Sequence, residues 1–417
     1  MKGGEQLRFR RARTVEALCR NCGFCKHMIS CQGEEDCLGC GICVDACPYS
    51  AKILREEQGA RPFTTIRVDG ESTQVPKGIT ILRALELLGH RVSTVPDKEA
   101  ICAPCRTGGC WSCAVMVNGQ LKPSCMTEAS EGDIIETQND LLDRQVPMRR
   151  VSGFQGHSVG GVGTPYWLKA SGWPSSHIEV ACFAHGCMLR CPTCQNWEVT
   201  YSSVAPPLAP REAAEIMTKA RKRYSVDRMA ISGGECTLNR RWLLQYLSEL
   251  KKMNPDRKAR LHVDTNAVVL TPEYIDDLVE AGMTDIGPDV KGLEADTFIR
   301  ITGVADGELA TTLLQNEWRA VEYLLDTYWR QLFIGIGIPY NPKLISLDEA
   351  SRIGEKIASY EPEVQVCVLD YRPEFRRQDL RKPTYDEMVR VKEVFEDSGL
   401  KCVICQTERG HIGPRRV

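Results

Sequence analysis

Three cysteines stand close together near the middle of the chain, at Cys187, Cys191 and Cys194, with the spacing C-x3-C-x2-C. Three closely spaced thiolates can hold three irons of a [4Fe–4S] cluster and leave the fourth iron without a protein ligand. A small molecule can bind at such an open iron and be reduced there. The alternative is a zinc knuckle, which needs a fourth Cys or His, and His185 could supply it.

A second group of cysteines lies near the N-terminus, and its spacing resembles that of bacterial ferredoxins with two clusters. The segment Cys37–Cys47 has the pattern C-x2-C-x2-C-x3-C and is followed by Pro48, and the segment Cys19–Cys31 repeats the first three positions with a longer last gap. In such ferredoxins the fourth Cys of each run serves the other cluster. The resemblance therefore implies one [4Fe–4S] cluster on Cys19, Cys22, Cys25 and Cys47, and another on Cys37, Cys40, Cys43 and Cys31. The gap between Cys31 and Cys37 is short, so the unswapped pairing stays open.

A third group has the plant-type [2Fe–2S] spacing, in Cys105-x4-Cys110-x2-Cys113 with Cys125 further on. Around it, the pattern predicts a hairpin at Asp69-Gly70, a helix over 79–88 and a hairpin at Asn118-Gly119. This order resembles the β-grasp ferredoxin fold of succinate dehydrogenase and complex I subunits. Gly108 and Gly109 suit a loop wrapped closely around a cluster. Cys102 has no place in this ligand set and is either a spare thiol or a competitor of Cys105.

From about residue 176 onwards, short β-branched runs alternate with amphipathic stretches, which predicts a parallel sheet with helices outside it. Six repeats indicate an α/β partial (β/α)6 barrel, and in such barrels the chemistry lies at the C-terminal ends of the strands. The expected strands are 178–183, 229–232, 261–265, 285–290, 332–338 and 364–369. The expected helices are 210–223, 240–253, 272–281, 309–329, 347–360 and 384–398. The polar motifs all follow strands: the cysteine triplet, Gly233-Gly234-Glu235, Asp264-Thr265-Asn266, Asp289 with Lys291, and Tyr371-Arg372-Pro373.

Over residues 176–410, the triplet followed by Gln195-Asn196-Trp197 resembles the radical S-adenosylmethionine (SAM) enzymes. The resemblance is greatest to the branch of pyruvate formate-lyase activating enzyme and the AmmeMemoRadiSam proteins. It implies that the open iron chelates SAM and drives its reductive cleavage to a 5′-deoxyadenosyl radical. By position, the residues implied to contact SAM or a neighbouring monovalent cation are Gly233, Gly234, Glu235, Asp264, Thr265, Asp289, Lys291 and Arg372. Lys291 matches a lysine that meets the SAM carboxylate, and a surface ion pair with Asp289 is the alternative.

Three positions depart from the activating enzymes. Thr193 stands where an aromatic residue usually faces adenine, and Arg372 stands where a histidine usually lies near the ribose. Cys236 replaces a proline and is expected to be a small buried residue rather than a ligand. Cys402 and Cys405 lie in an apolar run that predicts a strand, where positions three apart face opposite sides, so two buried thiols are favoured over a ligand pair.

Composition sets the limits on the class of protein. A chain of 417 residues with a formal charge of −2 gives no indication of nucleic-acid or membrane binding, although the segment from Lys2 to Arg20 is basic and could dock an acidic electron carrier. Twenty-one cysteines in clusters, without an apolar leader, predict an iron–sulfur protein of a reducing cytoplasm, in an anaerobe. The expected domains are a two-cluster ferredoxin-like domain (1–60), a β-grasp domain (61–145), a Gly/Ser/Pro-rich linker (146–176) and the barrel (177–417).

These observations predict an oxidoreductase that resembles the radical SAM activating enzymes. Its cofactors would be SAM, three [4Fe–4S] clusters, one [2Fe–2S] cluster and a monovalent cation. A low-potential donor of the ferredoxin or flavodoxin type would feed a built-in electron relay, and the substrate is a small molecule, a peptide or a partner protein. Two alternatives stay open: an activase that acts on a glycyl-radical enzyme, and a non-catalytic electron-transfer subunit of a larger complex.

Overall fold

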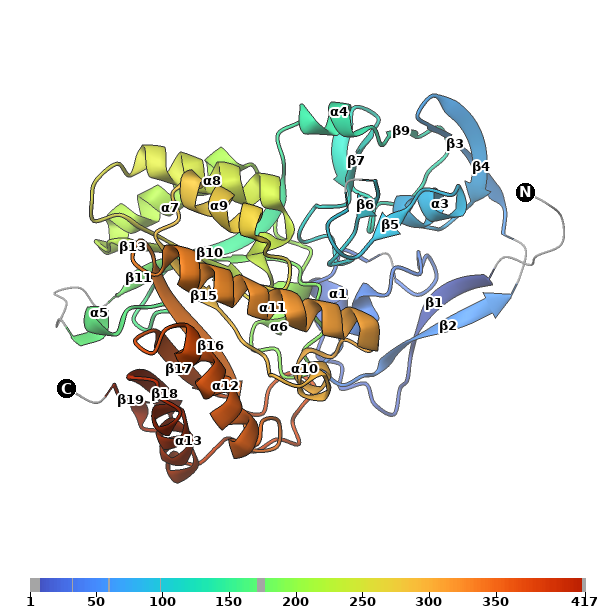
Figure 1. Cartoon of the computed structure of the whole chain (residues 1–417). Helices are drawn as coiled ribbons and strands as arrows, with labels where there is room; N and C mark the ends of the chain where they lie inside the picture. The colour runs from blue at the N-terminus through green and yellow to red at the C-terminus, as the bar shows by residue number, and fades with distance from the viewer. Residues whose placement is uncertain (1–7, 32, 59–60, 98, 171–176, 415–417) are drawn as a thin grey trace. The chain divides into compact units, whose positions relative to one another are not determined.

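A computed structural model describes residues 8–31, 33–58, 61–97, 99–170 and 177–414 (Figure 1). The chain forms two compact units. Unit 1 comprises Met1–Val151, Ala184–Met188 and Asn196–Ala209, and unit 2 comprises Ser152–Phe183, Leu189–Gln195 and Pro210–Val417. The beginning of the basic N-terminal segment, including Lys2, and positions 171–176 of the expected linker lie outside the described residues.

The first cysteine-rich region of unit 1 lies between two paired strands. Strand β1 (Arg8–Thr14) pairs antiparallel with β2 (Lys52–Gln58). Two four-residue helices lie between them, α1 (Phe24–His27) and α2 (Ile42–Asp45). Each helix follows a glycine in the left-handed region, Gly23 with φ 78° and Gly41 with φ 83°, a conformation that costs glycine little. Each of these glycines stands between two cysteines of a C-x2-C pair, so the chain turns where the thiols must converge.

The rest of unit 1 contains a five-stranded sheet in the order β4-β3-β9-β7-β8. Its strands are β3 (Phe63–Val68), β4 (Glu71–Pro76), β7 (Ala114–Val117), β8 (Gln120–Pro123) and β9 (Ile134–Glu136). Both expected hairpins are confirmed, with positive φ at Asp69-Gly70 and at Asn118-Gly119. Helix α3 (Ile81–Leu87) packs buried aliphatic side chains against this sheet. The smaller elements are β5 (Val92–Ser93), β6 (Ile101–Cys102), α4 (Asn139–Asp143), α6 (Trp197–Tyr201) and β12 (Pro207–Leu208).

Unit 2 has the expected α/β barrel character. Strands β13 to β18 pair in parallel in chain order, with β11 before them and β19 antiparallel at the end. The strands are β11 (Glu179–Ala184), β13 (Arg228–Gly233), β14 (Arg260–Thr265), β15 (Asp285–Pro288), β16 (Phe333–Tyr340), β17 (Gln365–Asp370), β18 (Cys402–Thr407) and β19 (Gly410–Ile412). The helices are α5 (Tyr166–Ala170), α7 (Pro210–Tyr224), η1 (Cys236–Leu238), α8 (Arg240–Met253), α9 (Pro272–Ala281), α10 (Ala295–Thr302), α11 (Gly307–Tyr328), α12 (Leu347–Tyr360) and α13 (Tyr385–Asp397). Figure 1 shows the long helices alongside the strands of this unit.

The six expected strands and six expected helices of the barrel are confirmed, several of them to the residue. Helix α9, for example, begins after the N-cap Thr271 and ends before Gly282, which has φ 113°. Helix α13 begins with a capping box formed by Thr384 and Glu387. The predicted strand at Cys402–Cys405 is also confirmed, as β18. Helix α10 was not predicted. No described helix combines the length and the apolar character needed to cross a bilayer.

The Gly160–Thr164 segment falls in the expected linker but packs against the strands of the barrel. A Cβ atom at Gly161 would clash with the carboxylate of Asp264, and one at Gly163 would lie 2.9 Å from the backbone N of Gly287. A Cβ at Gly335 would lie 3.0 Å from the Cα of Gly163. The segment therefore lies against side chains of β14 and against the backbone of β15 and β16. The expected linker also contains the whole of strand β10 (Arg149–His157), so it is more than flexible chain.

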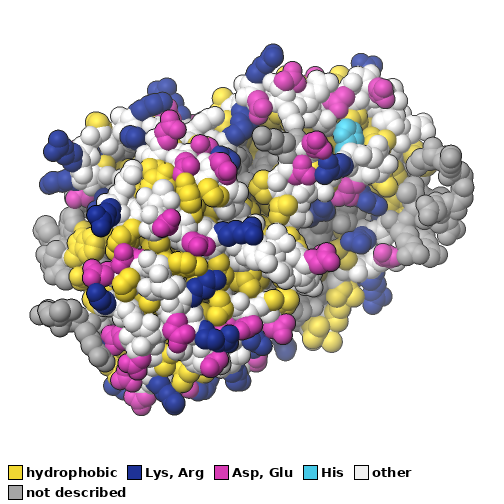
Figure 2. Space-filling view, in the orientation of Figure 1, with side chains coloured by type: hydrophobic (Ala, Val, Ile, Leu, Met, Phe, Trp, Pro, Cys, Tyr) yellow, Lys and Arg dark blue, Asp and Glu magenta, His cyan; other side chains and the backbone are white. Residues whose placement is uncertain are grey.

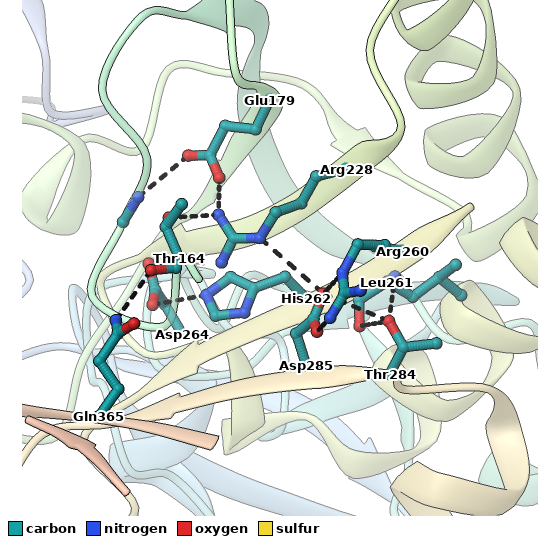
Figure 3. A network of polar contacts seen from close by, with 11 residues as sticks. Thr164, Glu179, Arg228, Arg260, Leu261, His262, Asp264, Thr284, Asp285 and Gln365 are labelled. Carbon is teal, nitrogen blue, oxygen red and sulfur yellow. Dashed lines mark hydrogen bonds and ion pairs between the residues drawn. The ribbon is translucent and has the colours of Figure 1, made fainter. Parts of the chain in front are cut away.

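A buried polar network fixes this segment to the strands (Figure 3). Arg228 on β13 forms a buried ion pair with Glu179 on β11 and donates to the Oγ1 of Thr164 at 2.6 Å. Glu179 accepts a hydrogen bond from the N–H of Gly161, and Gln365 on β17 donates to the carbonyl of Thr164 at 2.8 Å. Buried charges persist only where partners satisfy them, so the network holds the segment in one position.

Candidate functional site

The loop with the cysteine triplet follows β11 and passes from unit 1 to unit 2. Cys187 is buried in unit 1, while Cys191 and Cys194 lie in unit 2. Backbone hydrogen bonds fix the unit 2 part of the loop, since Arg190 N–H donates to the Thr302 carbonyl at 2.8 Å. Burial raises the pKa of Cys191 to about 12, and the ammonium of Lys291 opposes this rise. A bound metal would reverse this by stabilising the thiolate.

Lys291 and Asp289 form an ion pair at the end of β15. The Nζ of Lys291 lies 2.9 Å from Oδ2 of Asp289, and the lysine side chain is nearly completely buried. Burial lowers the pKa of Lys291, but Asp289 and other anionic neighbours outweigh it and hold that pKa well above its usual value. Burial raises the pKa of Asp289, and Lys291 opposes that rise. The pair is therefore not the exposed surface ion pair that the sequence left open.

Glu317 lies beside this pair, and sequence analysis did not single it out. It comes from α11, and its Oε1 accepts the backbone N–H of Lys291 at 2.9 Å. Its Oε2 has no partner among the described residues. Burial raises the pKa of Glu317 well above its usual value, so the carboxyl group is favoured in its neutral form.

The turn after β13 is held by the side chain of Glu235. Its Oε1 accepts from the N–H and the hydroxyl of Thr237, at 3.0 and 2.6 Å, and from the hydroxyl of Thr265, at 2.8 Å. Its Oε2 accepts from the N–H of Asn266 at 2.8 Å. Gly233, with φ 117°, and Gly234 are partly exposed beside it. The carboxylate thus joins the Gly-Gly-Glu turn to the end of β14, while the backbone of the two glycines stays accessible.

The residues expected to line a cation site are partly engaged elsewhere. Asp264 Oδ1 lies 2.8 Å from Nε2 of His262, and Oδ2 lies against Gly161. Burial raises the pKa of Asp264, but the neighbouring His262 and other groups bring it below its usual value. The hydroxyl of Thr265 donates to Glu235. Asp264 still lies close enough to Asp289 for its negative charge to raise the pKa of Asp289.

Among the positions that depart from the activating enzymes, Thr193 is buried and its Oγ1 has no partner in the described part of the chain. Arg372 is exposed. The neighbouring residue Tyr371 lies close to the site. Burial raises the pKa of Tyr371 above its usual range. The charges of Lys291, Asp289 and two cysteines of the triplet also act on this pKa. Cys236 is buried and donates to the Asp264 carbonyl, in agreement with its expected packing role.

The N-terminal cysteines form two groups, and each group contains the four cysteines that the swapped pairing assigns to one cluster. A cavity of about 470 Å³ is lined by Cys19, Cys22, Cys25 and Cys47. In the second group, burial raises the pKa of Cys43 to about 12, and the thiols of Cys31, Cys37 and Cys40 raise it further. Backbone N–H groups already point at several sulfurs, as from Ala51 to Cys47 at 3.2 Å and from Ala12 to Cys37 at 3.3 Å. Such donors stabilise thiolates, so both groups suit iron–sulfur clusters.

The third group is the most deeply buried. Cys105, Cys110, Cys113 and Cys125 are all buried in one loop region beside Leu82 and Ala103. The Nε1 of Trp111 is buried there without a partner among the residues described, and a cluster sulfide would give it an acceptor. Cys102 lies near this group, because Cys113 and Cys105 help to raise its pKa to about 12. The donor set fits a [2Fe–2S] cluster, with Cys102 as a neighbour.

Within the described ranges, no three His, Cys, Asp or Glu side chains converge closely enough to hold a single metal ion. The cysteines of a cluster bind different irons and need not converge on one point. For His185, the fourth ligand that a zinc knuckle would need, burial lowers the pKa to about 4, and Nδ1 lies 2.8 Å from the Ser202 carbonyl oxygen.

Family models match three parts of the chain. Residues 182–343 match the radical SAM superfamily. The chain contains a radical SAM domain. Residues 62–140 match the 2Fe-2S iron-sulfur cluster binding domain, and residues 33–53 match the 4Fe-4S binding domain. The radical SAM domain is thus combined with both kinds of ferredoxin-like domain in one chain.

The curated relatives match short parts of the chain. One subunit of the NADH-quinone oxidoreductase of Mycobacterium bovis is 37% identical over 90 residues, which are 21% of this chain and 11% of that protein. NADP-reducing hydrogenase subunit HndD of Solidesulfovibrio fructosivorans is 34% identical over 79 residues, which are 18% of this chain and 14% of that protein. The chain therefore spans a small fraction of the length of these relatives. Among solved structures, Streptococcus suis SuiB bound to S-adenosylmethionine aligns over 51% of this chain and 44% of its own, with 16% identity and a TM-score of 0.38.

Proposed function

We propose that the protein is a radical SAM enzyme that cleaves SAM reductively to a 5′-deoxyadenosyl radical, which abstracts hydrogen from a substrate. The observation that carries this proposal is the ion pair of buried Lys291 with partly buried Asp289 beside Cys191, at the end of β15. An ammonium buried beside the cysteines of an open-iron site is suited to bind the carboxylate of SAM. The cluster on Cys187, Cys191 and Cys194 would supply one electron to the SAM sulfonium.

The residues of the chain bind and orient SAM. Lys291 donates from Nζ to the SAM carboxylate, and Asp289 orients that ammonium. The backbone of Gly233 and Gly234 would contact the SAM amino group, and Glu235 holds this turn in place through its hydrogen bonds with Thr237, Thr265 and Asn266. Thr193 cannot stack on adenine, so backbone groups or another side chain would hold the adenine. A buried site excludes water and keeps a reactive species close to its target.

The N-terminal domains serve as an electron relay. Their cysteines would hold two accessory [4Fe–4S] clusters and one [2Fe–2S] cluster, and an external low-potential donor of the ferredoxin or flavodoxin type would reduce them. The basic residues of β1 would contribute to docking that donor, since ionic complementarity speeds association. On the face seen in Figure 2, Lys and Arg side chains are interspersed with Asp and Glu.

The test is anaerobic purification followed by incubation with dithionite and SAM. We expect about 14 irons per chain and release of 5′-deoxyadenosine and methionine. Cys191→Ser should lose this release, whereas Cys402→Ser, a thiol on β18 outside the clusters, should retain it. Full iron content with intact SAM would instead favour the non-catalytic electron-transfer subunit.

A second measurement tests the SAM contact itself. Lys291→Met should weaken SAM binding by about 10- to 100-fold, as expected for one charge-assisted hydrogen bond. The matched control is Lys258→Met, at an exposed position after α8. Labelled small molecules, peptides and candidate partner proteins can then be screened for hydrogen transfer into 5′-deoxyadenosine. Transfer from a protein glycine would identify the activase.

A further inference from the structure

The loop that carries the [2Fe–2S] ligands lies in backbone contact with the residue before Cys187. Gly186 has φ 83°, and a Cβ atom there would lie 2.9 Å from the Cβ of Cys105 and 3.0 Å from its Sγ. At Gly109, a Cβ atom would lie 2.5 Å from the backbone N of Gly186. A packed interior leaves no room for an extra atom at such distances. The two loops can therefore touch only because both positions are glycine.

Arg150 fastens the two loops together. Its N–H donates to the carbonyl of Gly109 at 3.1 Å, and its Nε donates to the carbonyl of Gly108 at 3.2 Å. Its own carbonyl accepts from the N–H of His185 at 3.0 Å. One residue of β10 thus bonds to the [2Fe–2S] loop on one side and to the start of the SAM-cluster loop on the other. The glycine contact is consequently a fixed feature of unit 1.

The contact between the two loops lies among buried side chains, and few atoms separate the two ligand sets. Cys105, Cys110 and Cys187 are all buried. Gly186 touches Cys105 and is covalently joined to Cys187, so one glycine separates a ligand of the predicted [2Fe–2S] cluster from a ligand of the predicted SAM cluster. Electron transfer between metal sites weakens steeply with distance, so a covalent and van der Waals path of this kind gives strong coupling.

Residues of the ferredoxin-like region also lie near the [2Fe–2S] ligand group. A cavity of about 630 Å³ in unit 1 is lined by Cys125 of the [2Fe–2S] group and by Cys40 of the second ferredoxin-like group. The [2Fe–2S] ligands therefore have both a ferredoxin-type ligand and the SAM-cluster loop in their surroundings.

We propose that the [2Fe–2S] site is the immediate electron donor to the SAM-cluster site, and that Gly109 and Gly186 are the positioning residues that bring the two ligand sets together. This rests on the proposed function, because both ligand sets must hold clusters. One electron leaves the reduced [2Fe–2S] site and one enters the oxidised [4Fe–4S] site, without transfer of a proton or formation of a bond. The external low-potential one-electron donor then restores the [2Fe–2S] site through the ferredoxin-like region.

The experiment measures magnetic coupling in the fully loaded chain. Anaerobic protein is reduced completely, and power saturation of the [2Fe–2S] electron paramagnetic resonance signal is recorded. The reference lacks the SAM cluster through Cys187→Ala, Cys191→Ala and Cys194→Ala combined. The test variant is Gly109→Ala. The control is Gly119→Ala on the β7–β8 turn, where φ is 75° but no atom lies within 4 Å of the new Cβ.

We expect the [2Fe–2S] signal to relax faster in the wild type than in the reference, because a second paramagnet lies nearby. Gly109→Ala should lose this enhancement, and Gly119→Ala should keep it. Equal relaxation of the [2Fe–2S] signal in wild type and reference overturns the proposal. This comparison does not need the Gly109→Ala variant, so it remains decisive if that variant fails to fold. Enhancement that appears only on a ferredoxin-type signal overturns it as well, since the donor would then be the N-terminal region, whose Phe24 packs on Trp197 with ring centroids 4.7 Å apart.

SAM cleavage with dithionite is measured on the same samples to separate the two proposals. Magnetic coupling without cleavage contradicts the proposed enzyme activity and leaves the proximity of the two sites intact. Cleavage without coupling contradicts only the assignment of the immediate donor.

Discussion

Replacement of Glu235 by Gln tests whether one carboxylate holds the Gly-Gly-Glu turn to the end of β14. The two oxygens of Glu235 accept at least four hydrogen bonds, with three donor groups at Oε1 and the N–H of Asn266 at Oε2. A glutamine keeps the shape but has only one oxygen. If that oxygen takes the three bonds at Oε1, the amide NH2 faces the N–H of Asn266, and two donors then oppose each other.

Glu235→Gln should lower the free energy of unfolding of unit 2. Loss of one hydrogen bond to a charged acceptor costs about 1.5–3 kcal/mol, and the other three bonds weaken because the acceptor is no longer charged. We expect a total of about 2–4 kcal/mol. In a unit of this size, that loss lowers the melting temperature by roughly 5–10 °C. Because the turn presents Gly233 and Gly234, SAM binding should weaken as well.

The assay combines anaerobic thermal unfolding with hydrogen exchange. The Asn266 amide should exchange faster in Glu235→Gln, because it loses its acceptor, while amides of the five-stranded sheet of unit 1 stay unchanged. The matched control is Glu280→Gln at an exposed position of α9. An unchanged melting temperature together with unchanged exchange at Asn266 would refute the role assigned to this carboxylate.

Three further predictions concern unit 2. Arg228→Met leaves the buried Glu179 without its ion-pair partner and should cost about 3–5 kcal/mol in denaturant unfolding, and adding Glu179→Gln should recover part of the loss. Gly163→Ala adds a Cβ 2.9 Å from a strand backbone and should cost about 1–3 kcal/mol, whereas Gly307→Ala, with no atom within 4 Å, should be neutral or stabilising. Burial raises the pKa of Glu317, so the stability that its neutral carboxyl group contributes is complete below about pH 4.5 and is lost as pH rises through the folded-state pKa. Glu317→Gln should therefore reduce the pH dependence of the free energy of unfolding above about pH 4.5. An unchanged pH profile in this variant would contradict the prediction.

Most barrel elements could be predicted because their signals are local, and the cluster ligands stay a prediction that rests on local cysteine spacing. Cysteine spacing within ten residues is set by cluster geometry and does not depend on the rest of the fold. Helix α9 was predicted to the residue because Thr271, Pro272 and Gly282 carry its start and stop signals. Helix α10 was missed because it is short and its N-cap, Glu294, makes no side-chain capping bond. Local signals thus determine what could be predicted of each element.

Residues that act across the fold were harder to predict. Glu317 lies 26 positions after Lys291, and only the packing of α11 brings its carboxyl group to the Lys291 amide. Within the sequence it is one charged residue among others on a long amphipathic helix. Tyr371 was noted only as part of a motif, since nothing in its neighbours indicates that its ring approaches Lys291. The contact between the [2Fe–2S] loop and the loop before Cys187 likewise follows from tertiary packing and not from local sequence.

The Gly160–Thr164 segment was predicted as linker from its composition, yet the sequence held a second signal. Glycine inside a strand weakens the strand and often marks a place where another backbone approaches closely. Gly287, Gly335 and Gly337 are all strand or strand-adjacent glycines of β15 and β16, and each of them meets the segment or its immediate surroundings. A glycine-rich stretch and a set of strand glycines are complementary, because close backbone packing requires the missing side chain on both sides.

The same rule applies at Gly109 and Gly186, where two glycines distant in the sequence again lie in contact. Paired glycines therefore indicate packed backbone, whereas glycines without such partners, as at Gly119, mark turns.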